Sequence, residues 1–231
     1  MGQVDIVVQP GAGRAKALLV ADMDSTMITV ECIDELADYA GIKPQIAAIT
    51  DAAMRGELDF AQALDARVAL LKGLDAAAID RCRAERVRIT PGATTLVRTM
   101  RARGATAILV SGGFTAFAAP IGAAIGFDRV IANRLDIADG RLSGTVARPI
   151  VDSATKERTL REARATLALD DRATLAVGDG ANDLAMIGIA GLGVAYRAKP
   201  VVAAAAAARI DHGDLTALLW AQGISRRDWV V

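Results

Sequence analysis

The chain has 231 residues, 53% of them hydrophobic, and its 27 basic and 27 acidic side chains cancel to a formal net charge of zero. A chain of this length can bury a sizeable core in one domain together with a smaller insertion. The even charge balance excludes the basic footprint of nucleic-acid binders, so any anionic ligand has to be held by a few local groups.

Neither a membrane span nor a zinc-binding motif is indicated. The longest uncharged apolar stretch, residues 184–196, is too short and too rich in glycine to cross a bilayer, and the N-terminus lacks a signal-peptide pattern. Cys32 and Cys82 are the only cysteines, and neither has CxxC or histidine neighbours. The sequence therefore predicts a cytoplasmic protein with reduced thiols, and no membrane or nucleic-acid partner.

Aliphatic runs of strand length recur along the chain, at residues 17–21, 106–110, 129–132, 174–177 and 189–195. Segments with helical periodicity, such as residues 93–103 and 155–169, separate them. Strands that alternate with helices predict an α/β fold with a doubly wound, mostly parallel sheet.

Residues 29–88 break this alternation, because they carry helical periodicity and no convincing strand. We expect a small helical cap here, inserted after the first strand. The remaining catalytic core would comprise residues 17–28 and 89–231, and residues 1–16 would form a short N-terminal extension.

Polar residues follow three of the predicted strands, at the carboxyl ends where open parallel sheets bind their ligands. The three groups are Asp22 with Asp24, Ser111 with Gly112, and Asp179 with Asn182 and Asp183. Two carboxylates so close repel each other unless a cation binds or one stays protonated. A DxD pair alone also fits an Asx turn, but a further carboxylate at another strand end favours Mg²⁺ bound together with a phosphate.

Two features suit an anion. Ser111 and Gly112 end a strand, so a hydroxyl and backbone N–H groups can approach a phosphate closely, although such turns are often only structural. Lys156 lies in the first turn of a helix that Asp152 or Ser153 can cap, where the helix dipole disfavours a cation by about 0.3–1 kcal/mol. A bound phosphate would make this position favourable, and a solvated surface lysine is the alternative.

In this order, the segments LLVADMDST, LVSGG, Lys156 and GDGAND resemble the motifs of the haloacid dehalogenase superfamily. Finer features are similar to the phosphoserine phosphatases of that superfamily, namely DMDSTMITVECIDELA, ITPGA and GVAYRAKP. The similarity covers about residues 17–215. It implies Mg²⁺-dependent hydrolysis of O-phospho-L-serine to L-serine and phosphate, the last step of serine biosynthesis.

The resemblance implies a role for each matching residue of the core. Asp22 would be the nucleophile that forms an aspartyl-phosphate, and Asp24 the acid/base. Mg²⁺ would be held by Asp22, the Asp24 carbonyl and Asp179. Asp183 would support the metal or Lys156 indirectly, without contacting the substrate. The phosphate would be contacted by Ser111, Gly112, Lys156 and Asn182.

In the cap, the resemblance implies that Glu31 and Arg67 recognise the amino acid. A guanidinium forks onto a carboxylate, so Arg67 suits the serine carboxylate, while Glu31 suits the ammonium group. Met54 and Phe60 would form apolar walls of the pocket.

Two other functions stay open at this stage. An aspartyl-phosphate can be intercepted by any alcohol that fits, which would make the protein a phosphotransferase to an acceptor such as homoserine. A non-catalytic sensor of phosphorylated ligands belongs to another class, and the intact set of Asp22, Asp24, Lys156 and Asp179 disfavours it.

Overall fold

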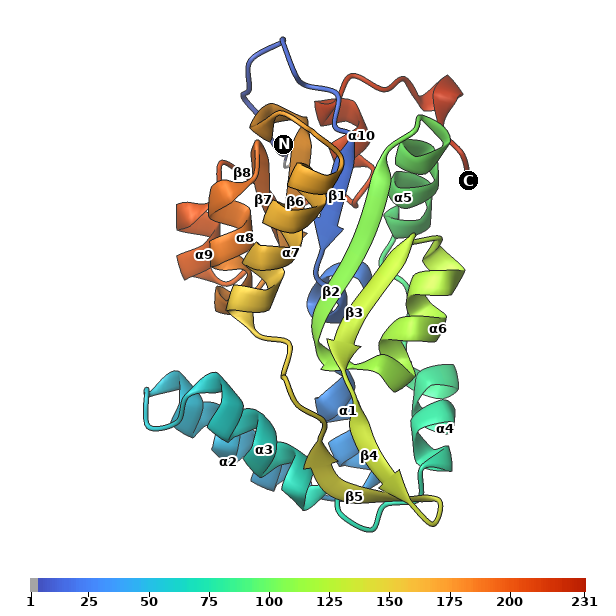
Figure 1. The fold of residues 1–231 in the computed structure, drawn as a ribbon, viewed down its shortest axis with the longest axis vertical. Coiled ribbons are helices and arrows are strands. Elements are labelled where there is room, and N and C mark those ends of the chain that lie inside the picture. Colours follow the sequence, from blue (N-terminus) through green and yellow to red (C-terminus); the bar gives the residue numbers. More distant parts are fainter. Residues whose placement is uncertain (1–3) are drawn as a thin grey trace.

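A six-stranded parallel sheet forms the centre of the computed structural model, which describes residues 4–231 (Figure 1). The strand order is β3–β2–β1–β6–β7–β8, and every neighbouring pair is parallel. The strands are β1 (Leu18–Ala21), β2 (Thr106–Phe114), β3 (Arg129–Asn133), β6 (Thr174–Gly178), β7 (Leu192–Tyr196) and β8 (Ala208–Ile210). The doubly wound sheet is thus confirmed, and its strand order reverses at β1, where such sheets bind ligands.

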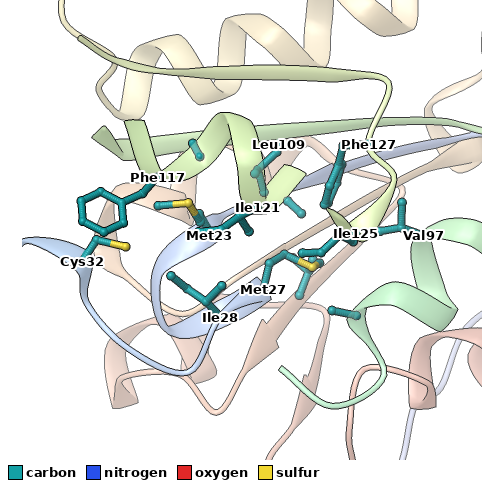
Figure 2. Packing of buried hydrophobic residues seen from close by; sticks show 14 of the residues in the cluster. Met23, Met27, Ile28, Cys32, Val97, Leu109, Phe117, Ile121, Ile125 and Phe127 are labelled. Atoms are coloured by element: carbon teal, nitrogen blue, oxygen red, sulfur yellow. The ribbon is translucent and has the colours of Figure 1, made fainter. Parts of the chain in front are cut away.

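Helices cover both faces of this sheet, so β1 is buried on both sides. Leu18 and Val20 pack on one face with residues of α7 (Ser153–Thr166), α8 (Leu184–Ile189) and α9 (Pro200–Ala205). Leu19 and Ala21 face α5 (Ala93–Ala102), α6 (Thr115–Ile125) and α10 (Ala217–Ala221). Figure 2 shows Met23 and other buried side chains of this second cluster. Each fully buried aliphatic side chain stabilises the fold by about 1.5–3 kcal/mol.

The segment between β1 and β2 is helical, as expected for a cap inserted after the first strand. It contains α1 (Cys32–Tyr39), α2 (Lys43–Met54), α3 (Phe60–Leu70) and α4 (Ala77–Arg86). A capping box starts α3, in which Asp59 accepts a hydrogen bond from the Gln62 N–H and the Gln62 side chain accepts one from the Asp59 N–H. The exact boundaries at residues 28/29 and 88/89 stay a prediction.

A hairpin that the sequence analysis did not predict joins this helical insertion. It consists of β4 (Leu135–Ala138) and β5 (Arg141–Val146), and it lies beside α3 at one end of the molecule (Figure 1). The N–H of Gly73 donates to the Leu142 carbonyl at 2.8 Å, which ties the hairpin to the chain just after α3. The chain therefore passes from the sheet to this end of the molecule twice, after β1 and after β3.

The predicted N-terminal extension is described from Val4 onward, and residues 1–3 lie outside the described residues. Asp5 anchors it, because its carboxylate accepts hydrogen bonds from the N–H groups of Asp211, His212 and Gly213 at 2.7–3.3 Å. Among the helices of residues 4–231, none has the length and apolar character needed to cross a membrane.

Candidate active site

The side chains predicted from the strand ends meet at the carboxyl edge of the sheet. Asp22 follows β1, Ser111 lies in the last part of β2, and Asp179 follows β6. Because these three strands are adjacent and parallel, their carboxyl ends open onto the same place. Lys156 reaches this place from α7.

Lys156 connects two of the carboxylates. Its Nζ donates to Oδ1 of Asp22 and to Oδ1 of Asp183, both at 2.6 Å, and its side chain is fully buried. The helix begins with Asp152 as N-cap, which accepts from the Thr155 N–H at 2.8 Å. Burial alone would lower the pKa of Lys156, but the two carboxylates outweigh it and the pKa is raised. Lys156 is therefore a permanent cation in the site and not a surface lysine.

Asp24 points away from this ion pair. Its Oδ1 accepts from the Cys32 N–H at 2.9 Å, at the start of α1, and its Oδ2 accepts from the Ser111 hydroxyl at 3.3 Å. Burial, and then the charge of Glu31, raise the pKa of Asp24 to about 7. A carboxyl group that titrates near neutral pH is suited to both donating and accepting a proton.

Asp179 and Asp183 complete an acidic cluster. Asp179 accepts from the Thr26 hydroxyl at 3.2 Å, while Oδ2 of Asp183 accepts from the N–H groups of Asp179 and Gly180 at 3.2 and 3.0 Å. Burial, followed by the charges of Glu31 and Asp183, raises the pKa of Asp179 to about 6. Burial and the charge of Asp183 also raise the pKa of Asp22, against the opposing effect of Lys156.

This cluster suits a divalent cation. Asp22, Asp179 and Asp183 each offer a carboxylate oxygen within 4.8 Å of the others. Asp24 is buried beside them, and Lys156 forms ion pairs with only Asp22 and Asp183, so the buried carboxylates outnumber the cation that pairs with them. Hard oxygen ligands at the end of a sheet are what a cation such as Mg²⁺ requires, and its charge would offset that excess.

The Ser111–Gly113 segment bulges out of β2 and leaves no room for larger side chains. The register with β3 shifts between Ser111 and Phe114. A Cβ atom on Gly113 would lie 2.7 Å from Oδ2 of Asp24, and one on Gly112 would lie 3.1 Å from the Phe60 ring. Phe60, from α3, thus covers the loop that is expected to approach a phosphate.

The two charged residues predicted in the cap, Glu31 and Arg67, differ in sign and in the groups that they contact. Glu31 accepts from the Ser25 hydroxyl at 2.7 Å, and its charge acts on both Asp24 and Asp179. Arg67 lies on α3, and its Nε donates to the carbonyl of Ala63 one turn earlier, at 3.1 Å. Within residues 4–231 Arg67 makes no ion pair, although burial lowers its pKa. Its guanidinium is therefore available for an anionic ligand.

Two other predicted residues contribute less to the described geometry. Asn182 is half-buried and its Oδ1 lies against Gly180, where a Cβ atom would approach it to 2.3 Å. The side chain of Met54 lies outside the described residues, so its place in the pocket stays a prediction. The sequence analysis missed Thr26, although a hydroxyl four residues after Asp22 in the same turn could have indicated it.

Comparisons with known proteins identify the family of the chain. Residues 19–188 match the haloacid dehalogenase-like hydrolase family. The chain is 50% identical to a phosphoserine phosphatase of Streptomyces coelicolor, over 93% of the chain but only 52% of that protein. It is 47% identical to a phosphoserine phosphatase of a Polaromonas species, over 87% of the chain and 88% of the relative. The chain thus spans about half the length of some curated relatives and most of others.

The solved structures give the same result for the fold. A substrate-bound phosphoserine phosphatase complex superposes with a TM-score of 0.82 at 36% identity, and the match covers 89% of this chain and 97% of that one. A phospho-aspartyl intermediate analogue of phosphoserine phosphatase superposes equally well, with a TM-score of 0.82.

Proposed function

Because this chain belongs to the haloacid dehalogenase-like hydrolase family, we propose that it hydrolyses O-phospho-L-serine to L-serine and phosphate. The observation that carries the proposal is the pairing at the end of β1, where Asp22 contacts the buried ammonium of Lys156 and Asp24 is held separately by Cys32 and Ser111. Lys156 favours the charged form of Asp22, against the burial that raises the pKa of this carboxyl, and so supports Asp22 as the nucleophile. The pKa of Asp24, at about 7, suits an acid/base.

In the first half-reaction, a carboxylate oxygen of Asp22 forms a bond to phosphorus as the bond between phosphorus and the serine oxygen breaks. Protonated Asp24 gives its proton to the leaving oxygen, so L-serine departs as an alcohol. In the second, ionised Asp24 takes a proton from water, the water oxygen bonds to phosphorus, and Asp22 leaves as a carboxylate. Lys156 offsets the charge of the Asp22 carboxylate before the first half-reaction and again when Asp22 is released, and it needs no proton transfer of its own.

We propose that the metal is Mg²⁺, held by Asp22, the backbone carbonyl of Asp24 and Asp179. When bound, such a cation would offset negative charge on the phosphoryl oxygens. Asp183 accepts hydrogen bonds from Lys156 and from the N–H groups of Asp179 and Gly180, which supports a role in orienting Lys156 and the loop that carries Asp179. Ser111, Gly112 and Asn182 would contact the phosphate.

The amino-acid part of the substrate would lie between the sheet and the helical insertion. The guanidinium of Arg67, which forms no ion pair within the described residues, would bind the serine carboxylate, and Glu31 would bind the ammonium group. Phe60 and Met54 would be apolar walls. The balanced charge of the chain and its two buried free cysteines fit a cytoplasmic enzyme for a small metabolite.

A phosphate-release panel of small phosphoesters tests the proposal. Phosphoserine should be turned over faster than phosphothreonine or sugar phosphates, and Asp22→Asn should lose activity by about 10³-fold or more. Undiminished turnover by Asp22→Asn would exclude the nucleophile, and a sugar phosphate as the best substrate would exclude phosphoserine. Transfer of phosphate to added homoserine would favour the phosphotransferase alternative.

A further inference from the structure

Asn133 is a buried polar side chain that no step above uses. It ends β3, at the same edge of the sheet as Asp22 and Ser111, and only 2% of it is exposed. A buried amide has two donors and one acceptor to satisfy, so its partners show what it holds in place.

The Asn133 amide joins two backbone segments from different parts of the chain. Its Nδ2 donates to the carbonyl of Gly112 at 2.8 Å and to that of Val151 at 3.4 Å. Its Oδ1 accepts from the N–H of Val151 at 2.7 Å. Gly112 and Val151 are thereby fixed to one planar group.

The first of these segments is the bulge of β2. The ladder between β2 and β3 pairs Ser111 with Ala132 and then jumps to Phe114 with Asn133, which leaves the two glycines outside the register. The Nδ2 bond to the Gly112 carbonyl takes the place of the lost ladder contact. Asn133 therefore fixes the peptide plane between Gly112 and Gly113, and the N–H of that plane donates to the Ser111 hydroxyl oxygen at 2.9 Å, so the amide also helps to orient Ser111.

The second segment leads directly to Lys156. Val151 precedes Asp152, whose side chain caps α7 by accepting from the Thr155 N–H at 2.8 Å. Lys156 lies in the first turn of that helix with its Nζ at 2.6 Å from Asp22. A shift of Val151 would therefore move the start of the helix that carries the lysine.

We propose that Asn133 is a positioning residue for the phosphoryl group, which keeps the Ser111–Gly113 loop and the start of α7 at a fixed separation. The proposal rests on the proposed function only in assigning these two elements to the phosphate. The hydrogen bonds of the Asn133 side chain go to Gly112 and Val151, and not to the expected nucleophile or to the helical insertion. Its loss should therefore weaken phosphate binding and leave recognition of the serine moiety intact.

The experiment compares Asn133→Leu, which keeps the branched shape of the side chain but removes all three hydrogen bonds, with Val130→Ala, which creates a cavity in the same strand. Inhibition constants for inorganic phosphate and L-serine, kcat/KM for phosphoserine and para-nitrophenyl phosphate, and thermal unfolding are measured for each. We expect Asn133→Leu to raise the inhibition constant of phosphate at least tenfold, with that of L-serine changed less than twofold and both values unchanged in Val130→Ala.

The proposal is overturned if the inhibition constant of phosphate for Asn133→Leu stays at the wild-type value. It is also overturned if Val130→Ala, at the same thermal stability, weakens phosphate inhibition equally. If Asn133→Leu does not fold, Asn133→Ser carries the same comparison. If the wild type cleaves para-nitrophenyl phosphate but not phosphoserine, the proposed substrate is wrong. The role of Asn133 is still tested in that case, because it is decided by the inhibition constants for inorganic phosphate.

Discussion

The ammonium nitrogen of Lys156 lies 2.6 Å from a carboxylate oxygen of Asp22, and the two side chains are 0% and 7% exposed. A cation in the first turn of a helix is unfavourable by itself, so this ion pair and the one with Asp183 explain why it is there. Such a pair contributes little net stability, but removal of one partner leaves an uncompensated charge in the interior.

Replacement of the lysine tests this relationship. Lys156→Met should lower kcat/KM by about 10²–10³-fold, since it removes a fixed positive charge next to the reacting group. It should also destabilise the protein by about 3–5 kcal/mol, because Asp22 and Asp183 would lose their counter-charge. Steady-state kinetics and chemical denaturation measure both, with the exposed Lys43→Met as control. Equal kinetics in the two variants would contradict the assignment.

The acid/base assignment predicts a defect in both half-reactions. Asp24→Asn keeps the size of the side chain and the acceptor for the Cys32 N–H but cannot exchange a proton, so kcat should fall by about 10²–10⁴-fold. Substrates with good leaving groups need no proton in the first half-reaction, so a burst of para-nitrophenol followed by slow turnover is expected. Rapid-quench kinetics would show it, and a normal steady state would exclude the role.

Metal removal should affect stability as well as activity. Chelation with EDTA leaves the acidic cluster without a divalent counter-charge, and re-addition of Mg²⁺ to 100 times its dissociation constant should raise the free energy of unfolding by about 2.7 kcal/mol. Asp179→Asn should weaken this effect, whereas the exposed Asp171→Asn should not. Thermal unfolding against Mg²⁺ concentration is the measurement, and an unchanged melting temperature in wild type would count against the site.

Arg67 should determine affinity for the substrate's carboxylate and not the chemical step. Arg67→Gln should lower kcat/KM for phosphoserine by about 10²-fold, through KM, because a buried charged hydrogen bond is lost. Arg67→Lys should restore little of it, since an ammonium cannot form the bidentate pair. Turnover of para-nitrophenyl phosphate, which has no carboxylate, should be unchanged. A parallel loss for both substrates would place Arg67 in the phosphate site instead.

The anchor of the N-terminal segment predicts a pH-dependent stability outside the site. Burial works to raise the pKa of Asp5, but three backbone hydrogen bonds outweigh it and the pKa is lowered. Its stabilisation is therefore complete above the unfolded pKa of about 3.9 and is lost as the pH falls through the lower folded value. Asp5→Ala should cost about 1–2 kcal/mol at pH 7. That difference from wild type should shrink toward pH 3, unlike any effect of the exposed Asp51→Ala.

Much of this fold could be predicted because its strands are buried on both faces. The run that contains Leu18–Ala21 reads as a strand without reference to its neighbours, since all four residues are apolar. The strand β8 (Ala208–Ile210) has three residues, one of them an exposed arginine, and carries no such pattern. It exists because β7 offers it an edge, which is a tertiary effect.

The hairpin of β4 and β5 was missed despite a local signal. Asp139 and Gly140 both adopt positive φ angles, 50° and 73°, and an Asp-Gly pair between short strands is typical of a hairpin turn. The flanking strands are short and largely exposed, so their hydrophobic alternation is weak.

Some residues of the candidate site could be predicted from local sequence patterns, and others depend on contacts between distant parts of the chain. Asp22, Ser111 and Asp179 could be placed together from sequence, because parallel strands bring their carboxyl ends to one edge. Asn133 could not be placed in this way, since the expected strand stopped at residue 132. The role of its amide depends on a hydrogen bond with Val151, eighteen residues later in the chain. Hydrogen bonds between loops follow from the packed structure and leave no periodic trace in the sequence.

The four chain segments that leave and re-enter the sheet are joined in two pairs. Thr29 and Thr90 form backbone hydrogen bonds of 3.0 Å across the first pair, with Arg88 and Met27 as acceptors. Asn133 and Val151 close the second pair. Arg83 of α4 adds a third connection, because its guanidinium donates to the Ala116 carbonyl in α6 at 3.2 Å. These bonds hold α1–α4 and the hairpin against the carboxyl edge of the sheet at three separate points, so the loss of one connection leaves the other two in place.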